Sequence, residues 1–225
     1  MTVAEFYDSV AASYEAAFAH NAGLLKLVNK AMNYLPAQAH VLDIGCGTGR
    51  PVASILADAG HQVVGIDIAK TMVELSQKNV PRGRFEVADM RNYDGPAGTE
   101  HLDAVFNIFS LFRFNREEIE SFIKRWGSWI NINGLLCIGT MAVDDCPPDR
   151  LLNGADTDSL GTREVRNYFM GQQRVHTLFT RAGWVLLLQQ NGFEVVDQWM
   201  ELFVPPECAQ TDDAPFYYII AKKVK

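Results

Sequence analysis

The chain is predicted to fold as a doubly wound α/β sheet that is mostly parallel, with an antiparallel C-terminal hairpin and helices on both faces. Short apolar runs alternate with helical patterns from residue 40 onward, and a glycine-rich turn joins the first run to the next helix. The last two apolar runs have no helix between them. With 225 residues the chain is long enough to bury one core, so we expect a single domain. We divide this domain into an N-terminal helical cover (1–35), a core (36–141), an insertion (142–176) and a closing helix and hairpin (177–225).

Two amphipathic helices are predicted before the core, over residues 3–18 and 21–34, because apolar side chains recur there at helical spacing. They are expected to cover the core. Five strands then alternate with three helices, which predicts right-handed crossovers and a parallel sheet. The strands are 40–45, 62–67, 84–89, 102–109 and 134–141, and the helices are 49–59, 69–79 and 115–131. Glycine stops the first of these helices at Gly60 and the last at Asn133-Gly134.

The alternation of strands and helices stops at residues 142–176, because a stretch rich in Asp, Gly, Thr and Arg does not match a core element. We interpret it as an insertion over the face where the strands end. A helix over 178–190 follows, and then two strands over 193–203 and 216–223. Since no helix separates these two strands, they are predicted to form an antiparallel edge hairpin.

Composition and charge exclude several classes of partner. The formal net charge is −7, so the chain lacks the positive field that gathers phosphate backbones, and neither nucleic acid nor an anionic membrane is expected. No apolar run reaches the length of a membrane span, and the acidic N-terminal residues do not match a secretory signal. Four scattered cysteines without a CxxC pair are typical of reduced thiols, which predicts a cytoplasmic protein.

The most informative segment is 41–49, in which an apolar run ends in Asp43 and opens into Gly45, Gly47 and Gly49. A strand that turns into a helix through glycines can hold a ligand against backbone amides. A dinucleotide fingerprint would place its third glycine at position 50, which is arginine here. The leading Asp43 would repel a pyrophosphate and suits a cationic amino group, so the spacing weakens the NAD interpretation.

Polar side chains also end the next strands of the predicted sheet, where ligands of such folds bind. Asp67 lies 22 positions after Gly45 and suits the two hydroxyls of a ribose. Asp89 could accept a hydrogen bond from an exocyclic amine or cap the following turn, and Met90 beside it could lie on a purine face.

This series of motifs, with the strand that ends near Asn107, resembles the class I S-adenosylmethionine-dependent methyltransferases that act on small molecules. The resemblance covers residues 36–141 and extends to the closing helix and hairpin. It implies a Rossmann-like fold and S-adenosylmethionine as the cofactor. The opening Tyr7-Asp8-x-x-Ala11-x-x-Tyr14 resembles the family's leading helix, although an aromatic stripe is also typical of a core. The resemblance assigns cofactor contacts to Tyr7, Tyr14, Asp43, Gly45, Cys46, Gly47, Gly49, Asp67, Ile68, Met72, Asp89, Met90, Asn107, Ile108 and Phe109.

Three residues are candidates for catalysis: His176, Tyr14 and Arg113. His176 follows the insertion, where the family often places a substrate-facing residue, but a solvated or capping histidine is the favoured interpretation. Arg113 stands where related sequences often carry histidine, which suggests a contact with an anion or carbonyl of the substrate. The acids at 144 and 145 resemble the acid pair of metal-dependent catechol methyltransferases, yet their flanking pattern differs, so no metal is expected.

The function predicted from these observations is methyl transfer to an O, N or S atom of a small molecule, such as a secondary metabolite. The alternative is a methyltransferase-like protein that binds cofactor or ligand without transferring a methyl group, because fold does not determine function. A weaker alternative is an NAD-dependent oxidoreductase. The sequence leaves the methyl acceptor and the oligomeric state open.

Overall fold

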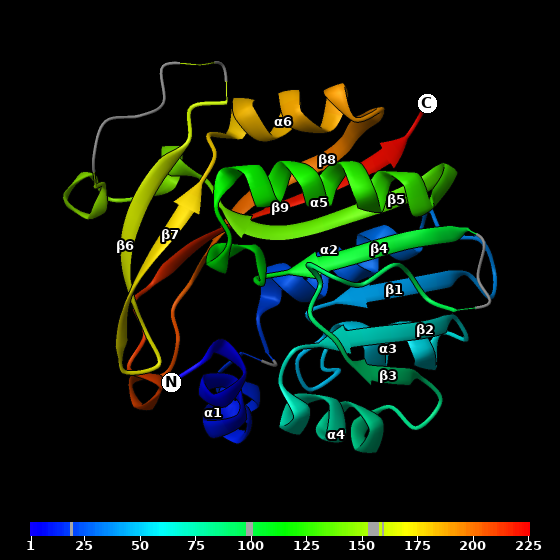
Figure 1. The fold of residues 1–225 in the computed structure, drawn as a ribbon, viewed down its shortest axis with the longest axis horizontal. Helices are drawn as coiled ribbons and strands as arrows, with labels where there is room; N and C mark the ends of the chain where they lie inside the picture. Colours follow the sequence, from blue (N-terminus) through cyan, green and yellow to red (C-terminus); the bar gives the residue numbers. More distant parts are fainter. Residues whose placement is uncertain (19, 98–100, 153–157, 159) are drawn as a thin grey trace.

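Seven strands form the central sheet of the computed structural model, in the order β3-β2-β1-β4-β5-β9-β8 (Figure 1). The structure describes residues 1–18, 20–97, 101–152, 158 and 160–225. The first five strands run parallel, and β9 pairs antiparallel with both β5 and β8. This arrangement confirms the predicted fold class. The strands are β1 (His40–Ile44), β2 (Gln62–Asp67), β3 (Arg84–Val87), β4 (Leu102–Ile108), β5 (Ile130–Met141), β8 (Phe193–Phe203) and β9 (Ala214–Lys223).

Helices cover both faces of this sheet and bury its apolar side chains in two clusters. The helices α2 (Ala22–Met32), α3 (Val52–Asp58) and α4 (Lys70–Asn79) contribute to one cluster, and α5 (Arg116–Trp129) and α6 (Arg181–Gln190) contribute to the other. In the second cluster Trp126 and Trp184 are buried, and removing a large side chain of this kind from water contributes about 1.5–3 kcal/mol.

A second, two-stranded sheet lies within the predicted insertion, so the expectation that residues 142–176 contain no regular element is wrong. The strands β6 (Arg163–Phe169) and β7 (Gln172–Leu178) form an antiparallel hairpin, while residues 153–157 and 159 of the insertion lie outside the described residues. Met170 and Gly171 join the strands, and both have positive φ, as the tightest hairpin turns require. The hairpin was missed because its inward face carries polar residues, which conceal the usual alternation of apolar and polar side chains.

Two predicted boundaries are also wrong. Asn133-Gly134 does not end α5, which stops at Trp129, but lies inside β5. Between the pairs Leu102↔Ile130 and Ala104↔Leu135, β5 advances five residues while β4 advances two, and Asn133 adopts a φ of 69° in this bulge. The last helix begins at Arg181 rather than at 178, because β7 extends to Leu178 and Thr180 caps the helix by accepting a hydrogen bond from the Gly183 amide.

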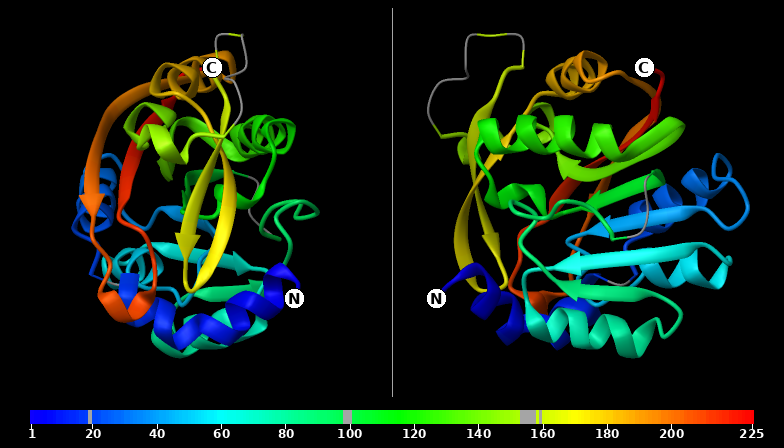
Figure 2. Two further views of the ribbon diagram at one scale, coloured as in Figure 1. Left: turned by 90° about the vertical axis from the view of Figure 1, so that its left-hand side faces the viewer. Right: turned by 45° about the vertical axis from the view of Figure 1, so that its right-hand side comes forward.

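Three elements gather beyond the carboxyl ends of the parallel strands (Figures 1 and 2). They are α1 (Val3–Phe18), the β6–β7 hairpin, and the loop that joins β8 to β9. In a doubly wound sheet this edge is where ligands bind. Within the described ranges, no helix combines the length and the apolar character needed to cross a bilayer.

Candidate active site

Two adjoining cavities open at the carboxyl edge of the sheet. The first lies against the glycine loop and the ends of β2, β3 and β4 and holds about 740 Å³ of space, part of it open to solvent. The second lies under the β6–β7 hairpin and holds about 630 Å³, again partly open to solvent. Tyr7, Tyr14, Phe109 and Arg113 line both cavities and form a wall that the two share. We call the first the strand-end cavity and the second the hairpin cavity.

The glycine loop approaches the strand-end cavity with its backbone. Gly45 and Gly47 line the cavity and have φ angles of 75° and 54°, a region that residues with a Cβ atom rarely adopt. A Cβ atom at Gly45 would lie 2.7 Å from the Cβ atom of Ser110, so a larger residue cannot replace it without movement. Gly49 faces α4 instead, where an added Cβ atom would lie 3.1 Å from Val80.

Asp67 ends β2 and points its carboxylate at the strand-end cavity. One oxygen accepts a hydrogen bond from the Gly47 amide at 3.0 Å, and the other accepts one from the Ala69 amide at 2.9 Å. Burial raises the pKa of this carboxyl, while hydrogen bonds from the backbone amides of Ala69, Gly47 and Ile68 act in the opposite direction. A carboxylate can accept about four hydrogen bonds, so the side chain can also bind a ligand while it fixes the loop.

Asp43 lies behind the glycine loop, is 2% exposed and does not line the cavity. Its Oδ2 atom has no hydrogen-bond partner among the described residues. Burial raises the pKa of Asp43 to about 7, and the negative charge of Asp67 adds to this effect. Two buried carboxylates close to one cavity disfavour an anionic ligand there and favour a cationic one.

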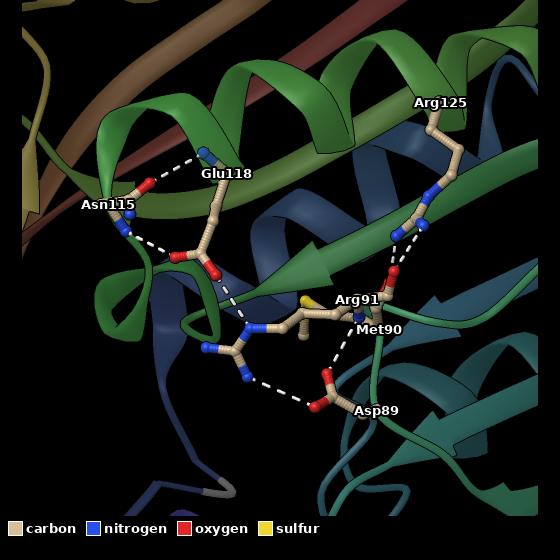
Figure 3. Close-up of polar contacts among 6 residues, drawn as sticks. All are labelled: Asp89, Met90, Arg91, Asn115, Glu118 and Arg125. Carbon is tan, nitrogen blue, oxygen red and sulfur yellow. Dashed lines mark hydrogen bonds and ion pairs between the residues drawn. The ribbon is translucent and has the colours of Figure 1, made fainter.

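A network of charged side chains holds the loop after β3 against α5 (Figure 3). Arg91 lies 3.3 Å from the Asp89 carboxylate and donates a hydrogen bond to Glu118 at 2.8 Å. Arg125 on α5 donates hydrogen bonds to the backbone carbonyls of Met90 and Arg91. Glu118 also belongs to the capping box that begins α5, so helix and loop share one anchor. The network places Asp89 and Met90 along the strand-end cavity, two and three residues after β3 ends.

Of the fifteen residues predicted to contact a cofactor, eleven line the strand-end cavity and four lie behind it. Behind it are Asp43, Gly49, Cys46 and Asn107. Asn107 donates hydrogen bonds to the Ile44 carbonyl and the Ser110 hydroxyl, and so fixes the strand ends. The lining residues are Tyr7, Tyr14, Gly45, Gly47, Asp67, Ile68, Met72, Asp89, Met90, Ile108 and Phe109.

Aromatic rings form most of the hairpin cavity. Phe109 has a φ of 56°, and its ring stacks on Phe216 at 3.9 Å between centroids and lies nearly parallel to Phe112, at 7°. Tyr14 stacks on Phe18, and Phe169 of the hairpin contacts both rings. Burial raises the pKa of Tyr14, which keeps its hydroxyl protonated. The cavity therefore offers flat apolar faces beside the shared wall.

His176 is buried on the inward face of β7 and lines the hairpin cavity. Its Nδ1 atom lies 3.0 Å from the carbonyl oxygen of Phe112. Burial lowers the pKa of His176 to about 4, with smaller contributions in the same direction from Arg113 and Arg174. The ring is therefore neutral at physiological pH. Its Nδ1–H then donates to the carbonyl, and Nε2 keeps a lone pair that can accept a proton or a hydrogen bond.

Arg174 lies two residues before His176 on the same strand face and was missed by sequence reasoning. The signal that could have found it is the alternation along β7, in which Arg174, His176 and Leu178 point inward and Val175 is exposed. Ser110, Arg91 and Phe114 of the strand-end cavity were missed as well.

The acid pair at 144 and 145 binds an arginine. Asp144 accepts a hydrogen bond from the Arg181 amide at 2.7 Å, and Asp145 forms an ion pair with the Arg181 guanidinium. Over the described part of the chain, no group of three or more His, Cys, Asp or Glu side chains could hold a metal ion.

Comparison with known proteins finds similar sequences for the core of the chain. Residues 41–134 match the family described as methyltransferase domain. A tRNA N(3)-cytidine methyltransferase from Danio rerio is 29% identical over 65% of this chain and 45% of its own length. An O-methyltransferase from Penicillium expansum is 39% identical over 34% of this chain and 29% of its own length. The matches thus span less than half of each of these two relatives.

The fold of the whole chain is similar to that of a solved structure. The 1,6-didemethyltoxoflavin-N1-methyltransferase from Burkholderia thailandensis superposes with a TM-score of 0.63 at 18% identity, over 100% of this chain and 92% of that one. At 18% identity this likeness shows a shared fold, whereas the family match shows sequence similarity in the core, over residues 41–134. The core of the chain, residues 41–134, thus matches a methyltransferase domain, and the whole chain has the fold of a methyltransferase.

Proposed function

We propose that this chain transfers a methyl group from S-adenosylmethionine to an O, N or S atom of a small molecule. The observation that carries the proposal is the shared wall of Tyr7, Tyr14, Phe109 and Arg113 between two cavities of different chemistry. The strand-end cavity has acids and exposed backbone, and the hairpin cavity has aromatic faces. A donor in the first cavity and an acceptor in the second would meet at that wall.

The residues of the strand-end cavity fit the donor. Asp67 would accept hydrogen bonds from the ribose hydroxyls, and the loop held by Arg91 and Arg125 would place Asp89 and Met90 at the adenine. The unpartnered Oδ2 of buried Asp43 supplies negative potential that favours a cationic ligand. When bound there, the cofactor supplies a methyl group that its sulfonium already activates.

The residues of the hairpin cavity would do the remaining work, which is to align the acceptor and exclude water. Phe109 would position a flat acceptor against the shared wall, since its ring faces both cavities. His176 would accept a hydrogen bond from the nucleophilic group through Nε2, and take up its proton as the methyl group is transferred. Tyr14, whose hydroxyl stays protonated, would orient the acceptor as a hydrogen-bond donor.

A small acceptor fits this chain better than a nucleic acid, although one relative is a tRNA methyltransferase. The hairpin cavity is lined mainly by aromatic and apolar side chains with a few polar groups, as small-molecule sites are. The formal net charge of −7 opposes binding of a phosphate backbone. We also propose a cytoplasmic location, which the free thiols of the four cysteines support.

The experiment is a pair of measurements on the full chain. Calorimetry with S-adenosylhomocysteine and with NAD tests the strand-end cavity, and we expect binding of the nucleoside alone. Incubation with methyl-labelled S-adenosylmethionine and a panel of phenols, thiols and amines tests transfer. Preference for NAD would overturn the proposal. Tight cofactor binding without transfer to any acceptor would favour the alternative of a binding protein that does not methylate.

A further inference from the structure

Two arginines line the hairpin cavity and have no assigned role in the proposed methyl transfer. Arg113 lies on the short helical turn after β4 (Leu111–Arg113), and Arg174 lies on β7. Both guanidiniums contact the ring of buried Phe6, with their central carbons 5.7 Å and 4.4 Å from its centroid. They come from segments 61 positions apart, so the fold brings two positive charges to one place.

Like charges this close repel each other, and the structure does not compensate the repulsion with an acid. Among the described residues neither guanidinium forms an ion pair with a carboxylate, and the Nε atom of each is buried without a hydrogen-bond partner. Their partners within the described ranges are uncharged: Arg174 donates to the amide oxygen of Gln172, and Arg113 interacts with the Tyr7 hydroxyl. Burial and the nearby charge of Arg113 lower the pKa of Arg174, which reflects the cost of holding the two together.

Two acidic residues of the described chain line the hairpin cavity, and neither pairs with Arg113 or Arg174. Asp212 accepts a hydrogen bond from the Tyr168 amide at 2.8 Å and lies 3.4 Å from Arg150. Asp213 lines the cavity but is exposed. An anionic ligand is therefore the group that would neutralise Arg113 and Arg174, and a carboxylate matches the fork of an arginine.

Arg174 and His176 come from the same face of β7, two residues apart, and both line the hairpin cavity. One small ligand can therefore contact both side chains. A monocyclic aromatic acid with a nucleophilic substituent carries one group for each of them. Phe109 and Phe112, whose rings are nearly parallel, line the same cavity and offer flat faces to such a ring.

We propose that the methyl acceptor is a flat aromatic carboxylate, held by Arg113 and Arg174 at its acid group and directed by His176 at its nucleophilic group. This inference rests on the proposed function, since it names the substrate class of the same site. It makes Arg174 a residue that determines specificity.

The test compares matched acids and amides as ligands, without requiring turnover. Benzoate, 4-hydroxybenzoate and 2-naphthoate are titrated against the protein saturated with S-adenosylhomocysteine, and so are benzamide, 4-hydroxybenzamide and 2-naphthamide. We expect at least one acid to bind about tenfold more tightly than its amide, because a hydrogen bond to a charged group is the stronger one. Saturation with the nucleoside ensures that the probes compete only for the hairpin cavity.

Two variants on the same hairpin locate the effect. Arg174→Gln should abolish the preference for the acid while the affinity for the amide and for S-adenosylhomocysteine stays as in the wild type. Arg166→Gln removes the same charge from an exposed position on β6 and should leave every affinity unchanged. Equal affinity for acid and amide in all three pairs, absence of binding by every acid, or a preference that survives in Arg174→Gln would overturn the inference.

The same titrations separate this inference from the proposed function. S-adenosylhomocysteine is titrated first, and the acids and amides are then compared both with and without it. If the nucleoside does not bind, the proposed function fails, whereas the comparison without it still measures the preference for acids. If the nucleoside binds and no acid is preferred, only the substrate class is refuted.

Discussion

The strand-end cavity and the hairpin cavity share a wall, but different elements of the fold line the rest of each cavity. The strand-end cavity is lined mainly by the glycine loop and by residues at or just beyond the ends of β2, β3 and β4, so the sheet sets most of its geometry. The hairpin cavity adds side chains from α1, the β6–β7 hairpin and the β8–β9 loop to residues at the ends of β4, β5 and β9. The difference teaches that the strand-end cavity is largely a property of the sheet, whereas the hairpin cavity also depends on the elements attached to the sheet.

The largest effect is expected at the donor side, from Asp67→Ala. The substitution removes the acceptor of the Gly47 and Ala69 amides together with the proposed ribose contact. We expect binding of S-adenosylhomocysteine to weaken by about 1.5–3 kcal/mol, measured by calorimetry. Affinity of the hairpin cavity for its own ligand, measured without nucleoside, should change little.

Asp67→Asn is the matched control, since it keeps one oxygen acceptor and nearly the same shape. Its loss of nucleoside affinity should be smaller than that of the alanine variant. If Asp67→Ala binds the nucleoside as tightly as the wild type, the ribose assignment is wrong. The proposal that the strand-end cavity holds the cofactor then loses its main support.

On the acceptor side, His176→Ala should lower kcat by about 10–100-fold, because it removes the proposed proton acceptor. The affinity for S-adenosylhomocysteine should stay unchanged, because His176 lines only the hairpin cavity. Thr177→Ala, one position along β7, serves as the control for the hairpin. Unaltered turnover of His176→Ala would assign the histidine to packing against Phe112.

A smaller, pH-dependent effect is expected from Asp43. Its pKa of about 7 lies above the ordinary carboxyl value, so the folded state without ligand holds a proton that the unfolded state has lost between about pH 4 and 7. The free energy of unfolding therefore falls as the pH rises through this window. Conversely, binding of S-adenosylmethionine should tighten severalfold from pH 6 to 7.5, as the carboxylate becomes charged.

Asp43→Asn supplies the comparison, because it cannot ionise. Calorimetry across the same pH range should show a flatter dependence in this variant. An identical slope in variant and wild type would mean that another group titrates, and that the buried carboxylate does not act on the cofactor.

The smallest effect is expected at the anchor between the β3 loop and α5. Glu118→Gln keeps the shape of the capping side chain but weakens its ion pair with partly exposed Arg91. We expect a loss of about 0.5 kcal/mol in the free energy of unfolding, measured by urea denaturation. Glu117→Gln, exposed in the same helical turn, is the control. A loss above about 2 kcal/mol would show that the anchor stabilises more than a surface pair does.

The donor side could be predicted from the sequence because its signals are local. The polar residues at the strand ends, such as Asp67, and the glycines that require positive φ can be recognised within a few residues of sequence. The parallel direction of the first five strands follows from the alternation of strands and helices. The four residues behind the cavity were predicted as contacts because a motif identifies its members without telling which of them face the ligand.

The acceptor side could not be predicted to the same extent, for a physical reason. On the inward face of the β6–β7 hairpin, Asn167, Arg174 and His176 occupy positions that a core would fill with apolar residues. These polar residues conceal the strands from a hydrophobic pattern. Tyr14 and Phe169, which meet across the cavity, are 155 residues apart in the sequence, and no local signal predicts such a contact.

The hydrogen bonds of Asp67 to the Gly47 and Ala69 amides have a consequence for kinetics. They join residues of the chain to one another, so the protein itself fixes the backbone turn that would receive the cofactor. A binding surface that needs no rearrangement loses little conformational freedom on association. Cofactor capture should then follow a single exponential whose rate rises linearly with concentration, without the plateau that a slow closing step produces.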